Sequence, residues 1–289
     1  MRHILLLFML IAIAVPLCAQ SDANKGQIVG TVYDPVQAVV PNAKVQVQNK
    51  ATGAVREFTT GPEGQFRAIL LDAGSYDVRV DAQGFARRVY QNVTVNVGSA
   101  VSLDVTLQLG GADLEINVAD TFLPIDLPNP TTTIDMTSIE DLPINGRRFQ
   151  DFATLTPTVQ VDQERGQLSF LGQRGINANV MVDGSDYNNP FFGGIRGGER
   201  SNFIVTVPQS SVQEFQAVTA GYSAEYGRSS GGLLNVITKS GANALHGESF
   251  YQIRHKEMGK NTPFGIKILE TQQQFGGGAG GAIKKDKLF

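Results

Sequence analysis

The chain has 289 residues and a formal net charge of −3, which is length enough for about two domains that each bury a core. The small charge and the lack of any run rich in Lys and Arg exclude the electrostatic pattern of a nucleic-acid-binding protein. Cys18 is the one cysteine in the sequence, so the residues after it must be held together by packing, without disulfides.

Residues 1–20 have the pattern of a secretory signal peptide. Arg2 and His3 precede an apolar run over 4–15, and a short exit segment with a small residue follows. The run is shorter than the roughly 20 apolar residues that a membrane-spanning helix requires. Cys18 offers lipoprotein processing as an alternative, but Leu17 stands where such a site takes a small residue, so we expect simple cleavage and export.

Residues 26–110 alternate between short β-prone segments and turn signals, which predicts a β-sandwich of about seven strands. The predicted strands are 27–33, 43–48, 54–59, 65–69, 75–80, 87–97 and 100–109. The last is the most regular, because apolar and polar residues alternate strictly from Val101 to Leu109 and predict one buried face.

This segment resembles the carboxypeptidase-regulatory-like domain. The matching residues are Gly30-Thr31-Val32, Pro41-Asn42-Ala43-Lys44-Val45, Gly61-Pro62-Glu63-Gly64-Gln65-Phe66, Ala73-Gly74-Ser75-Tyr76 and Gln83-Gly84-Phe85. The resemblance implies an Ig-like sandwich that is an accessory of peptidases, and the segment has no histidine for a zinc site. Because the fold also resembles starch-binding modules, a carbohydrate ligand stays open. Its candidate aromatics are Tyr33, Tyr76, Phe85 and Tyr90, of which Tyr76 and Phe85 are better explained as core residues.

Residues 111–135 are predicted to be a linker, and residues 136–241 a second domain of mixed α/β structure. In the second domain, Thr137 or Ser138 is placed to cap a short helix that ends near Pro143. Farther on, Phe149, Phe152 and Leu155 fall at helical spacing, and we expect them to be core contacts.

A hairpin is predicted at Asp183-Gly184, because the pair follows a β-prone run over 179–182 and both residues tolerate positive φ. The loop 185–200 comes next, and residues 212–218 then match a strand of the family whose motifs are given below.

Residues 218–247 are similar to the end of the plug domain and the first barrel strand of TonB-dependent outer-membrane receptors. The motifs in order are Tyr226-Gly227, Gly231-Gly232, Leu234-Asn235-Val236-Ile237 and Thr238-Lys239-Ser240-Gly241. Residues 139–149, with the pairs Arg174-Gly175 and Asp183-Gly184, resemble the Oar-like subfamily. The resemblance implies a mainly β protein: the sandwich, a mixed α/β plug at 136–241 and the start of an outer-membrane β-barrel at 242–289.

The resemblance also implies a partner, the TonB energy transducer. A segment that TonB binds pairs by strand addition and makes little demand on side-chain identity. The candidates lie in the linker and are Leu114, Glu115, Ile116, Asn117, Val118 and Ala119. A plain interdomain strand explains the same run equally well.

Two further groups of site residues follow from the resemblance. In this family the loop after the Asp-Gly hairpin rises toward the outside and touches substrate, although a plain connector has comparable weight. The substrate-facing candidates are Tyr187, Asn188, Asn189, Phe191 and Phe192. Contacts between plug and barrel wall are implied for Arg174, Glu225 and Arg228, because charges buried inside a pore need partners.

Two sequence patterns typical of catalytic or nucleotide-binding sites occur, but neither is surrounded by the secondary structure that its function requires. Residues 227–231 fit Gly-x-Ser-x-Gly, but the following residues 231–237 are predicted to be a strand where that motif needs a helix. Residues 276–281 fit Gly-x-Gly-x-x-Gly without a βαβ unit around them. Only His246 and His255 follow the signal peptide, so no metal site, cofactor or enzymatic activity is expected.

A strand over 246–256 is predicted as the first of the barrel, and residues 274–289 resemble the subfamily's next strand and turn. A plugged barrel has about 22 strands, so we expect this chain to be the front part of a longer receptor. The predicted function is energised uptake of a bulky nutrient, with the plug gating a barrel in the outer membrane. The alternative is an exported carbohydrate-binding or adhesin-like module without transport.

Overall fold

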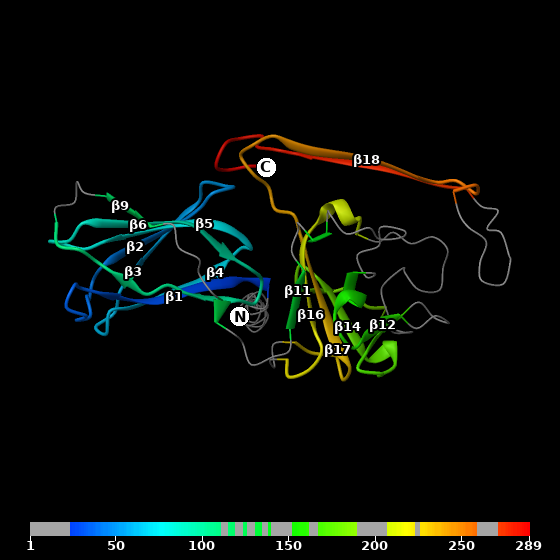
Figure 1. Ribbon diagram of the computed structural model, residues 1–289, viewed down its shortest axis with the longest axis horizontal. Coiled ribbons are helices and arrows are strands. Elements are labelled where there is room, and N and C mark those ends of the chain that lie inside the picture. The colour runs from blue at the N-terminus through cyan, green and yellow to red at the C-terminus, as the bar shows by residue number, and fades with distance from the viewer. Residues whose placement is uncertain are drawn as a thin grey trace, which may run out of the picture.

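The computed structural model describes residues 24–110, 115–118, 124–125, 131–134, 138–139, 152–161, 167–189, 207–222, 226–258 and 271–289 (Figure 1). The predicted signal peptide lies outside these ranges. The described parts form two β-rich modules and one long hairpin, which runs along the top of Figure 1. Among the residues described, no helix has the length and hydropathy to cross a membrane.

The first module, the sandwich, contains two five-stranded sheets. One has the order β3-β2-β5-β6-β9; the other has the order β10-β7-β1-β4, with β8 also paired to β1. The strands are β1 (Gly26–Tyr33), β2 (Lys44–Asn49), β3 (Val55–Thr59), β4 (Gln65–Leu71), β5 (Gly74–Asp81), β6 (Arg87–Val95), β7 (Ala100–Ser102), β8 (Val105–Thr106), β9 (Glu115–Val118) and β10 (Pro124–Ile125). Both β9 and β10 come from the linker, so the linker completes both sheets.

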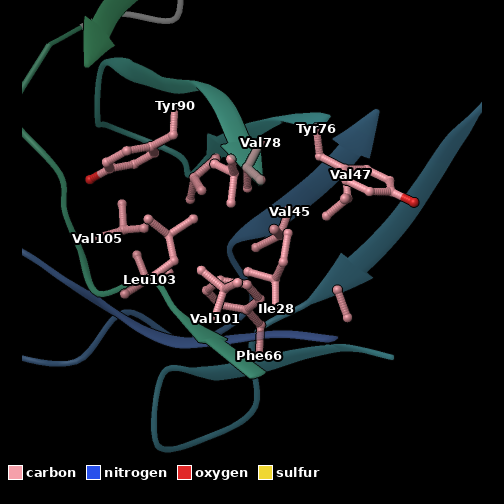
Figure 2. Packing of buried hydrophobic residues seen from close by; sticks show 14 of the residues in the cluster. Ile28, Val45, Val47, Phe66, Tyr76, Val78, Tyr90, Val101, Leu103 and Val105 are labelled. Atoms are coloured by element: carbon pink, nitrogen blue, oxygen red, sulfur yellow. The ribbon is translucent and has the colours of Figure 1, made fainter. Parts of the chain in front are cut away.

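The core of the sandwich consists of the inward-facing residues of the two sheets. Figure 2 shows Ile28 and Phe66 from one sheet facing Val45 and Val78 from the other. Tyr76 is buried and its hydroxyl donates to the Asp72 carbonyl (2.8 Å). The cluster also includes buried Tyr90, and Phe85 packs against it. The expectation that Tyr76 and Phe85 are core residues is confirmed.

The predicted strand 100–109 is wrong as a single strand, because it divides into β7 and β8. Between them, the Leu103 N–H donates to the Val29 carbonyl (2.8 Å), and the Asp104 carboxylate accepts the Thr31 N–H (3.0 Å) in place of a ladder bond. The predicted alternation holds up to Leu107. Leu109 was expected on the buried face but is 75% exposed, since the chain has passed the end of β1 and bridges to Phe85 instead.

The second module, the plug-like module (residues 131–240), is built on a sheet of order β11-β16-β17-β14-β15. The strands of the whole module are β11 (Thr131–Ile134), β12 (Val159–Val161), β13 (Leu168–Phe170), β14 (Ala178–Val182), β15 (Ser185–Asp186), β16 (Val212–Val218) and β17 (Gly232–Thr238). The 3₁₀ turns among the module's described residues are η2 (Ala153–Leu155), η3 (Gly175–Asn177) and η4 (Gln209–Ser211). The pairing of β14 with β17 is parallel, and a buried cluster around Phe152, Phe170 and Phe215 covers the sheet.

Ser138 and Ile139 are helical, in agreement with the predicted short helix. The rest of that helix and Phe149 lie outside the described residues. Phe152 is buried as expected. Leu155 was expected in the core but is 49% exposed. Its helix is only the short turn η2, which ends at Leu155 because Thr156 is extended, so there is no longer amphipathic face to bury it.

The third part is the antiparallel hairpin of β18 (His246–Arg254) and β19 (Gln272–Gly280). The two strands stay in register along their full length, from the pair His246 and Gly280 to the pair Arg254 and Gln272. Tyr251 and Phe275 are cross-strand partners and both are exposed. The predicted strand 246–256 is therefore confirmed with its end two residues earlier, and the strand expected within 274–289 is present but begins two residues earlier, at Gln272.

Candidate functional site

The Asp-Gly hairpin anchors the candidate site. Asp183 (φ 48°) and Gly184 (φ 76°) are both left-handed and join β14 to β15, as predicted. The Asp183 carboxylate accepts the Thr238 N–H (2.9 Å) and hydroxyl (2.7 Å). The turn is thereby attached to the end of β17, where the Thr-Lys-Ser-Gly motif begins.

A network of polar side chains continues from this hairpin, with buried Asn188 at its centre. The Asn188 side chain accepts the Val180 N–H (3.1 Å) and donates to Asn179 Oδ1 and Asp186 Oδ1 (both 2.6 Å). Asn179 in turn donates to the Gly227 carbonyl (2.7 Å). The base of the loop after the hairpin is therefore joined to the Tyr-Gly-Arg segment before β17.

An ion pair between Arg228 and Asp186 closes this network on its exposed side. Burial opposes ionisation of Asp186, but the backbone and side-chain N–H donors of Asn188, together with the Arg228 guanidinium, outweigh it and hold the pKa of the carboxyl below its usual range. Arg228 reaches this position from a left-handed backbone (φ 53°).

Ser229, the serine of the Gly-x-Ser-x-Gly pattern, is part of the local backbone structure. Its hydroxyl accepts the Gly232 N–H (2.9 Å) and lies within hydrogen-bond distance of the carbonyls of Asn177 (3.1 Å) and Gly232 (2.7 Å). The segment that follows is the strand β17, as predicted. No group of metal-ligating side chains occurs within the described residues.

The linker is attached to both modules by strand pairing. Glu115–Val118, within the candidate TonB segment, form β9 and pair in parallel with β6 over the register from Arg87 to Tyr90. β10 pairs with β7, and β11 pairs with β16 of the plug-like module. Leu114 and Ala119 lie outside the described residues.

The two modules meet through polar groups on the outer face of β16. The carboxylate of Glu214 accepts the Val97 N–H (2.9 Å), and Gln216 donates to the Val97 carbonyl (3.4 Å). Gln213 donates to the Ala73 carbonyl (3.0 Å). Glu214 is only 4% exposed, so this contact buries an acidic side chain.

The other predicted site residues differ in their burial and in their contacts. Tyr187 packs against the core of the plug-like module, and Asn188 is held in the network above. Arg174 is exposed at the start of η3. Phe191, Phe192 and Glu225 lie outside the described residues. The substrate and barrel contacts proposed for all of these residues stay predictions.

Sequence reasoning missed Asn179, Asp186 and Glu214. Asp186 lies two residues before Asn188, a spacing at which a carboxylate often bonds a backbone N–H, and this local signal was available. Its pairing with Arg228 depends on the parallel register of β14 and β17, which no local pattern encodes.

Three family models match consecutive parts of the chain. The carboxypeptidase regulatory-like domain matches residues 27–108, the TonB-dependent receptor plug domain matches 124–233, and an outer membrane beta barrel domain matches 237–289. These matches confirm the fold class and the resemblances to the carboxypeptidase-regulatory-like domain, the plug and the outer-membrane barrel.

Among curated proteins, the TonB-dependent transporter Oar of Myxococcus xanthus is 27% identical over 293 residues. The alignment covers 92% of this chain and 26% of that transporter, so the chain spans about a quarter of its relative's length. Among solved structures, the siderophore receptor PirA of Acinetobacter baumannii aligns with 54% of this chain and 23% of its own, at 20% identity and a TM-score of 0.41. The Bacillus anthracis TIE protein aligns with 30% of this chain and 17% of its own, at 20% identity and a TM-score of 0.27.

Proposed function

We propose that this chain, a member of the TonB-dependent receptor family, supplies the accessory sandwich, the plug and the first barrel strands of an outer-membrane receptor for energised uptake of a bulky nutrient. The observation that carries the proposal is the plug-like sheet β11-β16-β17-β14-β15, whose loop base is fixed by the Asn188 network. A pore-blocking domain has to keep its shape until a partner pulls on it, and buried polar networks that are well bonded favour one arrangement.

The linker supports a connection between the partner and the plug. Residues 115–118 are already in an extended conformation as β9, the conformation that strand addition requires. Farther along the chain, the linker ends in β11, an edge strand of the plug-like sheet. Tension applied at residues 115–118 would therefore reach the plug through the backbone of β11.

Capture of this chain by the periplasmic domain of TonB tests the proposal. The wild-type chain should be retained in detergent, and a variant whose residues 115–118 are replaced by Gly and Ser should not be. The matched control replaces residues 55–58, in the edge strand β3 at the opposite side of the same sheet. Equal retention of wild type and the 115–118 variant would mean that TonB binds another segment. If neither were retained, TonB would not be a partner of this chain.

A carbohydrate-binding function is favoured by one separate observation. The sandwich carries an open groove of about 620 Å³, and Thr31, Glu63, Arg67 and Asp104 are among the residues that line it. Aromatic stacking is not available from Tyr76 or Tyr90, because both rings are buried. Retention on immobilised glycans that is lost on Glu63→Ala would support this function, and no retention would remove it.

A further inference from the structure

Asn243 lies where the chain passes from the plug-like module to the barrel hairpin, shortly before β18 begins. Its backbone N–H donates to the Ala51 carbonyl (2.9 Å), and its side-chain amide donates to the Thr52 carbonyl (2.9 Å). Ala51 and Thr52 belong to the turn between β2 and β3 of the sandwich. The sandwich therefore contacts the start of the barrel as well as the plug-like module.

The same side chain also bonds the turn that follows β19. The Asn243 amide donates to Asp286 Oδ1 (2.7 Å), and Asn243 Oδ1 accepts the Asp286 N–H (2.9 Å). The first residue of β18 pairs with the last residue of β19, so the segments before and after the hairpin lie at the same end of it. We call this end, residues 241–245 and 281–289, the barrel rim. Asn243 thus joins the sandwich turn to both segments of the rim.

The sandwich turn has a shape that fits the rim. Asn49 Oδ1 accepts the N–H groups of Ala51 (2.9 Å) and Thr52 (3.0 Å), which fixes the direction of the two carbonyls. Gly53 follows in a left-handed conformation (φ 74°), and a Cβ atom there would lie 2.5 Å from Asp286 Oδ1. Both the backbone conformation and the close approach of Asp286 therefore favour glycine at this position.

We propose that the β2–β3 turn of the sandwich is a docking site for the barrel rim, and that Asn243 is the positioning residue of this contact. The inference deepens the proposed function, on which it rests, since it gives the accessory sandwich a partner surface on the same receptor. Elsewhere, Glu214 and Gln213 bond the sandwich to the plug-like module. The sandwich thereby bridges plug and barrel, and a plug that leaves the barrel has to break one of the two contacts.

The docking is tested by cysteine crosslinking of the full chain, in which no cysteine follows Cys18. A Cβ atom at Gly53 would lie 3.4 Å from Asp286 Cγ, so Gly53→Cys with Asp286→Cys should form a disulfide under mild oxidation. The matched control is Gly84→Cys with Asp286→Cys. Gly84 is also left-handed (φ 85°) in a turn of the sandwich, but a Cβ atom there meets nothing within 4 Å. Equal crosslinking of the two pairs would overturn the docking.

The role of Asn243 is tested by adding Asn243→Ala to the Gly53 and Asp286 pair. The rate of crosslinking follows the effective concentration of the two thiols. Loss of the side-chain bonds of Asn243 should lower this rate at least about fivefold. Gln252→Ala removes an exposed amide from β18 and should leave the rate unchanged. An unchanged rate in Asn243→Ala would overturn the positioning role.

A second cysteine pair distinguishes loss of docking from loss of folding. Ser249→Cys with Gly277→Cys joins β18 to β19, where a Cβ atom at Gly277 would lie 3.6 Å from the Ser249 Cβ. This pair should crosslink at the same rate with and without Asn243→Ala. A lower rate here would show that Asn243 maintains the hairpin itself, which would overturn a role confined to docking.

The crosslinking requires neither TonB nor transport, so its outcome is separate from that of the capture experiment. Selective crosslinking without capture by TonB would remove the proposed partner and leave the docking in place. Capture by TonB without selective crosslinking would overturn the docking and leave the proposed function.

Discussion

Asn188 joins three backbone segments through one buried side chain. Its amide bonds Val180 of β14, the Asn179 side chain that holds Gly227, and Asp186 of β15. Asn188→Ala leaves several of these buried groups without partners, so we expect the free energy of unfolding to fall by about 1–3 kcal/mol. Urea unfolding measures the change. Gln160→Ala, at an exposed position in β12, is the control and should change it by less than about 0.5 kcal/mol; equal effects of the two changes would contradict the role of the network.

Asp186 gives the same region a dependence on pH. Its pKa is lower in the folded chain than its ordinary value of 3.8, so the unfolded chain takes up the proton at a higher pH than the folded chain does. The stability it contributes is complete above the unfolded pKa and is lost as pH falls through the folded pKa. Because the ion pair with Arg228 is largely exposed, its contribution should be below about 1 kcal/mol.

The measurement is the difference in free energy of unfolding between wild type and Asp186→Asn, followed from pH 7 down to about pH 2. The wild type should be more stable at pH 7, and the difference should disappear at the acid end. Arg228→Gln should reproduce part of the loss at pH 7. A difference independent of pH would show that the Asp186 carboxylate does not stabilise the fold through its charge.

At the scale of elements, β17 can contact β13 closely because Gly232 has no side chain. A Cβ atom on Gly232 would lie 2.4 Å from the ring of Phe170, which is fully packed in the core. Gly232→Ala should therefore destabilise the chain by about 1–3 kcal/mol, because the ring or the strand has to move. Gly227→Ala is the matched control, since its Cβ meets nothing within 4 Å, and it should be near neutral. Thermal unfolding of the two variants checks this, and equal shifts would refute the close contact.

The elements differ in how far they were predictable, for a physical reason. Short β-prone runs bounded by turn residues are a local signal, so β1 to β6 fell within a few residues of expectation, and β16 to β18 did so with the help of the family resemblance. Leu109 and Leu155 were placed wrongly, because their burial depends on where a neighbouring strand or turn ends. The Asp183-Gly184 turn was predictable from the residue pair alone, whereas the Arg228–Asp186 pair joins positions 42 apart in sequence and requires the parallel register of β14 and β17.

The linker shows the same limit more clearly. An extended, proline-containing segment was expected between two separate domains, yet β9, β10 and β11 each pair with a different sheet edge. Such pairing uses backbone groups, which every sequence carries, so side-chain patterns contain little information about it. The linker is therefore a structural part of both modules.

For the whole molecule, the contact between sandwich and plug-like module depends on Glu214. Its buried carboxylate accepts the N–H of Val97, a residue that is itself buried. Glu214→Ala leaves that N–H without this acceptor, and a buried unsatisfied donor costs about 1–3 kcal/mol. We expect the modules to lose their mutual stabilisation while each retains its own core. Calorimetry should then resolve two thermal transitions farther apart than in the wild type.

Glu63→Ala provides the control for this prediction, because Glu63 is an exposed carboxylate on the sandwich, away from the contact with β16. It removes the same charge and should leave the transitions where they are, since exposed substitutions away from special contacts change stability by less than about 0.5 kcal/mol. If Glu214→Ala also left the transitions unchanged, the contact would not depend on Glu214, and the bonds made by Gln213 and Gln216 together with the linker strands would hold the two modules together.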